Sequence, residues 1–128
     1  MPEYLQNLNL LGLVGAILFL VIAAILGTTA YESNIGTLKF GSRWGFKKDE
    51  VKESQDAWNT AHKAAWPFLA MAGVLSLFHG IGCLAVAVAM GQDSHRMIQV
   101  LLITGLIVTI ALYLLAQRVA LNSLEQRR

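Results

Sequence analysis

Three long stretches of the chain contain no aspartate, glutamate, lysine or arginine. They cover residues 4–31, 64–92 and 97–117 and are 28, 29 and 21 residues long. Because an α-helix rises about 1.5 Å per residue, about 20 apolar residues cross the roughly 30 Å hydrocarbon layer of a membrane. The pattern therefore predicts an all-α membrane protein that forms a single membrane domain, residues 1–128. The predicted transmembrane helices cover about residues 8–30, 65–90 and 97–118.

The composition and the placement of charges agree with a membrane environment. Apolar residues make up 55% of the chain and charged residues 14%, against about a quarter in soluble domains. Six of the ten lysines and arginines lie in the first connection, residues 32–63, and three lie near the C-terminus. The positive-inside rule therefore predicts a multi-pass protein of the cytoplasmic (inner) membrane, with the N-terminus and the 91–96 turn outside and the C-terminus in the cytoplasm. With no basic residue before it, the first apolar stretch is expected to be a retained span.

The first connection is predicted to be cytoplasmic and to touch the membrane surface. Lys39, Arg43 and Trp44 combine cations with an indole, which suits the headgroup layer, where aromatic rings lie at the interface and cations reach phosphate. Its second half has a helical pattern. We expect an interfacial amphipathic helix there, capped at its start by Asp49 and followed by glutamates in its first turn.

One face of this expected helix carries an unusual combination of side chains. Ser54, Trp58 and His62 recur at every fourth position and therefore lie in one stripe. In the simpler interpretation, Trp58 only anchors an interfacial helix in the headgroups. That interpretation does not explain why a hydroxyl and an imidazole share the line. The alternative is that the stripe packs against the cytoplasmic ends of the spans.

The stripe belongs to a longer motif. The sequence GFKKDEVKESQDAWNTAH, residues 45–62, resembles the SdpI/YhfL family of small membrane proteins, whose pattern G-[I/L]-R-T-P-x-T-x-x-S-x-x-x-W-x-x-x-H lies between the first two spans. Four residues match, and Lys47 stands where the family has an arginine, so that the charge is kept but the planar fork is lost. The matching residues are Gly45, Ser54, Trp58 and His62. Lys48, Asp49 and Val51 replace the family's threonine, proline and second threonine.

The resemblance implies a function in binding. Relatives include immunity proteins and signal receptors that protect a producing bacterial cell from a secreted toxic peptide, usually in longer chains. The chain is then expected to be a non-catalytic accessory or regulatory subunit of a larger membrane complex, or an immunity or receptor protein for a membrane-active peptide. Its expected partners are the lipid bilayer and another membrane protein or such a peptide. The residues expected to bind the partner are Gly45, Lys47, Ser54, Trp58 and His62.

Polar residues are few within the spans. Ser76 and His79 lie in the second span, and ionisable groups inside membranes often mark function. One interpretation is a hydrogen-bonded, structural His79. The other is a self-associating small transporter or channel in which His79 lines the path. Such a path needs polar residues at several depths, and apart from Thr104 and Thr109 the spans offer few.

Small residues recur at four-residue steps in the first two spans, which lets helix backbones approach closely. These rows either pack the three spans against one another or face a further protein. They are Gly12 with Ala16, Ala23 with Gly27, and Ala72 with Ser76 and Gly80.

The sequence predicts neither an enzyme nor a protein that binds a cofactor or a metal. It contains no metal-ligand spacing of cysteine and histidine, no glycine-rich phosphate loop and no paired catalytic carboxylates. Ser54 and His62 could form a catalytic dyad only across two helical turns, and Trp58 lies between them. Nucleic-acid binding is not expected, because five acidic residues offset the basic residues of the first connection.

Overall fold

The computed structural model describes residues 7–127, which contain three long α-helices and no strand. α2 covers Leu10–Ile35, α3 covers Gln55–Ala89, the short 3-10 helix η1 covers Gly91–Ser94, and α4 covers His95–Glu125. α2, α3 and the η1–α4 segment are each long and apolar enough to cross a membrane. The predicted all-α class with three helices of transmembrane length is confirmed, and these helices indicate a multi-pass membrane protein.

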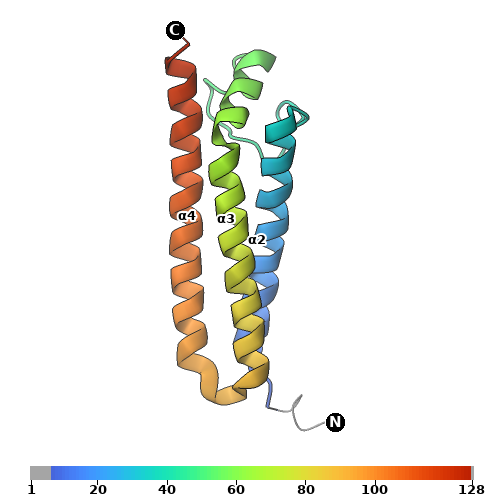
Figure 1. The fold of residues 1–128 in the computed structure, drawn as a ribbon, viewed down its shortest axis with the longest axis vertical. Coiled ribbons are helices and arrows are strands. Elements are labelled where there is room, and N and C mark those ends of the chain that lie inside the picture. The colour runs from blue at the N-terminus through green and yellow to red at the C-terminus, as the bar shows by residue number, and fades with distance from the viewer. Residues whose placement is uncertain (1–6, 128) are drawn as a thin grey trace.

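The three helices stand side by side, with α3 between α2 and α4 (Figure 1). η1 joins α3 to α4 at one end of the bundle, where α2 also begins, and we call this the turn end. Residues 36–53 and the last turns of α4 lie at the opposite end, which we call the loop end. α3 packs along both neighbours, whereas α2 and α4 contact each other little.

The turn end is closed by Asn9, the N-cap of α2. Its side-chain oxygen accepts a hydrogen bond from the Gly12 N–H (3.2 Å). Its amide nitrogen donates to the Gly91 carbonyl (3.4 Å) and to the Ser94 hydroxyl (3.3 Å). One buried side chain therefore caps α2 and holds η1 against it. α2 stops at Gly36, whose left-handed conformation (φ 75°) suits a residue without a side chain.

The predicted helix start at Asp49 is wrong. Residues 49–53 form turns and a bend, and Ser54 caps α3 by accepting a hydrogen bond from the Ala57 N–H (3.0 Å). The helix then continues through Pro67 without a break, so the expected stripe lies on the first turns of the second long helix and not on a separate one. With 35 residues, α3 is about 52 Å long, which exceeds the roughly 30 Å membrane core.

The loop between α2 and α3 belongs to the hydrophobic core. Leu38, Phe46 and Val51 are buried in one cluster with Trp58 and with residues of all three helices. The turn at residues 49–53 directs Val51 into this cluster. Ser54 has the extended backbone of an N-cap (φ −158°, ψ 167°) and supplies the capping hydroxyl, so the helix begins after Ser54 and not after Asp49.

The small-residue rows mostly pack the helices against one another. A Cβ atom at Gly12 would lie 2.6 Å from the Ala87 Cβ atom, and one at Gly73 would lie 3.2 Å from the Gly27 nitrogen. At these points only hydrogen fits between α2 and α3. Gly27 itself differs, because a Cβ atom there would meet nothing within 4 Å. The row that contains Gly27 therefore leaves an open surface on α2.

Candidate functional site

The loop of residues 36–53 is held against α3 by Trp58. The Trp58 side chain is fully buried, with 0% of its surface exposed. Its indole N–H donates a hydrogen bond to the Leu38 carbonyl oxygen (3.0 Å), and the Phe40 ring packs on the indole with centroids 5.3 Å apart. The indole points into the protein, so it does not serve as the headgroup anchor of the simpler interpretation.

His62 provides a second point of attachment for the loop. The imidazole is 1% exposed. Its Nε2 atom accepts a hydrogen bond from the Phe46 N–H (3.0 Å), and Nδ1 donates to the Trp58 carbonyl oxygen (2.8 Å). These two bonds require a proton on Nδ1 and none on Nε2, so the bonded imidazole is neutral. The Phe46 ring stacks on it with centroids 5.0 Å apart.

Gly45 completes this arrangement because the indole covers it. A Cβ atom at Gly45 would lie 2.3 Å and 2.6 Å from the Cη2 and Cζ2 atoms of Trp58, and 3.1 Å from His62 Nε2. No side chain fits there while the indole keeps its place. Ser54 adds the N-cap of the helix that carries both rings. We call Gly45, Ser54, Trp58 and His62 the loop brace.

The four-residue spacing predicts that Ser54, Trp58 and His62 share one helix face. It does not predict which residues cover that face. The covering residues are Leu38 and Phe46, with Val51 beside them in the core. A weak signal for them was present in the sequence, because isolated apolar residues in a polar loop are typical of a loop that packs on a core. The loop brace brings motif residues and these covering residues together.

The environment of His62 favours its neutral form. Burial lowers the pKa of His62, the hydrogen bond to the Trp58 carbonyl raises it, and the positive charge of Lys47 lowers it, with a net pKa below the usual value of 6.5. His62 lies before the charge-free stretch that begins at Ala64. The unfolded chain therefore takes up a proton at higher pH than the folded chain. The stability that His62 contributes is fully present above pH 6.5 and is lost as the pH falls toward the pKa of His62 in the folded protein.

Acidification is accordingly expected to destabilise the protein through His62. As the pH drops below the unfolded pKa, the free energy of unfolding should fall by up to about 1.4 kcal/mol per pH unit. Unfolding of the detergent-solubilised protein over a pH series measures this fall. The His62→Gln variant should lose the response, and His95→Gln, at an exposed histidine of the turn end, should keep it. An undiminished response in His62→Gln would contradict the assignment.

The loop brace leaves a cationic and aromatic surface facing outward. Lys39, Arg43 and Trp44 are exposed, Trp44 by 51%. Lys47 is exposed as well, and its ammonium group donates a hydrogen bond to the Ser42 carbonyl oxygen. The contact of these side chains with lipid headgroups stays a prediction. Arg43, Trp44 and Lys47 line a groove beside α2, and Trp44 also lines a hollow on another side of this helix.

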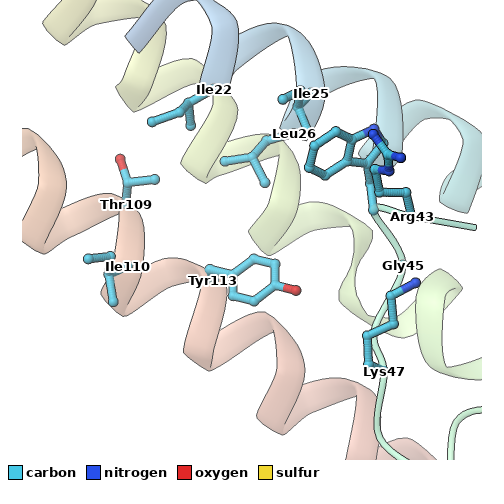
Figure 2. A pocket seen from close by; sticks show the side chains of 10 residues that line it. Ile22, Ile25, Leu26, Arg43, Gly45, Lys47, Thr109, Ile110 and Tyr113 are labelled. Carbon is cyan, nitrogen blue, oxygen red and sulfur yellow. The ribbon is translucent and has the colours of Figure 1, made fainter. Parts of the chain in front are cut away.

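The first groove lies between α2 and α4 and has a volume of about 430 Å³. Figure 2 shows side chains from α2, from α4 and from the loop on three sides of it. We call it the α2–α4 groove. Its lining includes Ile22, Leu26, Ile110 and Tyr113 from the helices and Arg43 and Lys47 from the loop.

The second groove lies between α2 and α3 on a different face of α2 and has a volume of about 420 Å³. We call it the α2–α3 groove. A hollow of about 340 Å³ continues it toward the loop. The groove is lined by Ala23, Ala24, Gly27, Ala70, Gly73 and Val74, and the hollow by Ala24, Thr28, Glu32, Ser42 and Trp44, among others.

Ser76 and His79, the polar residues predicted within the second span, are hydrogen-bonded in the bundle. Ser76 is buried and pairs with the Thr109 hydroxyl of α4 (3.0 Å). His79 donates from Nδ1 to the Leu75 carbonyl oxygen (2.7 Å), and its Nε2 lies 3.5 Å from the Thr104 hydroxyl. Within residues 7–127, no three histidine, cysteine or acidic side chains gather into a group that could hold a metal ion. A transport role for His79 stays a prediction.

Three helices of transmembrane length, with α3 between α2 and α4 and a braced loop at one end, indicate a small helical multi-pass membrane protein. Comparisons of the chain with protein-family models, curated proteins and solved structures find no match. The likeness of residues 45–62 to the SdpI/YhfL pattern therefore stays a resemblance.

Proposed function

We propose that the chain is a non-catalytic, SdpI-like accessory or receptor protein of the cytoplasmic membrane that binds another membrane protein or a membrane-active peptide. The observation that carries this proposal is the loop brace. Trp58 and His62 use their polar groups for contacts inside the protein, which fixes the loop and gives its exposed side chains defined positions. A preorganised surface loses less conformational entropy when it binds a partner.

The same contacts support binding over catalysis. Both ring nitrogens of His62 are engaged by backbone groups, and the Ser54 hydroxyl caps α3. The lone cysteine, Cys83, is buried in the bundle. A catalytic nucleophile needs an accessible position and a base within hydrogen-bond reach. We therefore assign the motif residues to holding the loop, and recognition to the exposed residues around it.

The proposed orientation places the loop end in the cytoplasm. The first connection and the C-terminal segment carry most of the lysines and arginines of the chain, whereas the turn end has Arg96, in the first turn of α4. The positive-inside rule favours this arrangement. The partner would then meet the protein within the membrane and at its inner surface.

The proposed partner surface consists of the α2–α3 groove and the hollow that continues it. Both include Ala24, and together they lead along α2 to the exposed Trp44. Gly27 lies in the groove with open space at its Cβ position, and such a backbone lets a partner helix approach closely. Trp44 adds an aromatic side chain of a type enriched in protein interfaces.

Photo-crosslinking in native membranes tests this proposal. A photoreactive amino acid at Val74, an exposed residue of the α2–α3 groove, is expected to give a discrete adduct with another protein or peptide. Leu115 on α4, which is 44% exposed against 52% for Val74, is the control position and should give none. Because space is open at Gly27, Gly27→Leu should weaken the adduct at least about tenfold, which corresponds to a loss of about 1.4 kcal/mol, without lowering the melting temperature.

The outcomes separate the candidate functions. An adduct with a larger membrane protein supports the accessory role, and one with a small peptide supports the receptor role. An adduct between two copies of this chain would instead favour the self-associating transporter or channel. Adducts of equal strength from Val74 and Leu115, or an adduct that Gly27→Leu leaves unchanged, would contradict the proposed surface.

A further inference from the structure

The α2–α4 groove has an apolar part and a cationic part. Its walls are hydrocarbon side chains, with Ile22 and Leu26 on α2 and Ile110 on α4. The loop supplies Arg43 and Lys47 at one end of the groove, and Figure 2 shows both on the loop side, beyond the apolar residues of the helices. A ligand that satisfies both parts is apolar along its length and anionic at one end.

The two cations of the groove are available to such a ligand. Among residues 7–127 the salt bridge joins Arg127 to Asp56, so Arg43 and Lys47 have no carboxylate partner within that range. No acidic residue lines the groove. Arginine binds phosphate oxygens through a planar pair of N–H donors, and lysine adds a compact positive charge.

The loop brace fixes where these cations lie. Gly45, between Arg43 and Lys47 in the sequence, also lines the groove, and it is pressed against the Trp58 indole. The neighbouring Phe46 N–H is bound to His62. The segment that carries both cations is therefore attached to α3 at its centre, so their backbone positions are set before a ligand arrives.

We propose that the α2–α4 groove is a binding site for one anionic phospholipid, whose acyl chain lies between α2 and α4 and whose phosphate lies between Arg43 and Lys47. The apolar walls disfavour a soluble anion, and the cations disfavour an uncharged alkyl chain. A zwitterionic lipid also has a phosphate, but its ammonium group would face two positive charges. The inner leaflet supplies anionic lipids. The groove shares Ile25 and Trp44 with the hollow of the proposed partner surface, so the variants that test the lipid site leave both of these residues unchanged.

Native mass spectrometry of the delipidated full-length protein in detergent tests the site. Phosphatidylglycerol is expected to bind as one molecule per chain, at least about tenfold more tightly than phosphatidylcholine with the same acyl chains. The double variant Arg43→Gln, Lys47→Gln should lose this preference. The matched control Lys48→Gln, Lys52→Gln removes the same charge from the same loop at positions outside the groove and should keep it.

A second variant tests the apolar part of the site. Ile110→Trp fills the groove but leaves both cations, and it should lower phosphatidylglycerol binding by a similar factor. Helical content and melting temperature establish that each variant is folded. Equal binding of the two lipids, or equal losses in the two double variants, would overturn the proposal. If soluble glycerol phosphate displaced bound phosphatidylglycerol as well as added lipid does, the cations would be assigned to a free anion. If a peptide were bound and Ile110→Trp displaced it, the groove would be assigned to that peptide.

Discussion

Replacing Trp58 by alanine is expected to lower the free energy of unfolding by about 3–5 kcal/mol, the range measured for large aromatic residues in protein cores. The indole is completely buried and is covered by the loop. Its removal leaves a cavity and leaves the Leu38 carbonyl oxygen without its indole donor. The loop of residues 36–53 should then separate from α3. Unfolding in a denaturing detergent series measures the loss of stability.

Limited proteolysis distinguishes local release of the loop from general destabilisation. Lys47, Lys48 and Lys52 are trypsin sites within the loop, and cleavage there should accelerate in Trp58→Ala under conditions where the helices remain folded. Trp66→Ala removes the same side chain from a partly exposed position on the same helix and is the control. If both variants lose equal stability and the loop of Trp58→Ala resists trypsin, then the indole does not hold the loop.

Gly12→Ala is expected to destabilise the bundle, although alanine is the better helix former by about 1 kcal/mol. The added Cβ atom would lie 2.6 Å from the Ala87 Cβ atom and 3.2 Å from the Cys83 carbonyl oxygen. Neither atom belongs to a flexible side-chain end, so α2 must move away from α3. Overpacking of this kind costs about 1–3 kcal/mol. The free energy of unfolding, measured in detergent, should therefore decrease.

Gly27→Ala provides the matched control, because it makes the same change on the same helix. Nothing lies within 4 Å of its Cβ position, so only the gain in helix propensity remains, and stability should stay equal or increase. The two substitutions are thus expected to change the free energy of unfolding in different directions. A loss of stability in Gly27→Ala as large as in Gly12→Ala would mean that the α2–α3 groove is closed in the folded protein.

The fold class was predictable because lipid imposes a simple requirement on the chain. A stretch without charges that is longer than the membrane core is typical of a spanning helix, and each of the three stretches lies largely within a helical segment long and apolar enough to cross a membrane. The start of α3 was not predictable in the same way. Asp49 and Ser54 are both good caps, and local sequence does not decide between them; the structure uses Ser54.

The site was predictable in part. The spacing of Ser54, Trp58 and His62 put them on one face, since helical periodicity is a local property. Their partners are not local, because Leu38 and Phe46 lie 20 and 16 residues away from the groups they bind. The α2–α4 groove was also hidden from the sequence. It brings together side chains from α2, the loop and α4, and no pattern within one segment indicates that they meet.

The contact between Gly45 and Trp58 couples the residue types that positions 45 and 58 can carry in related proteins. The two positions lie thirteen residues apart in the sequence, and the ring occupies the place that any side chain at position 45 would need. While tryptophan occupies position 58, position 45 must remain glycine, and a larger residue at position 45 requires a smaller one at position 58. Distant homologues should therefore be sought by this coupled pair and its fixed interval.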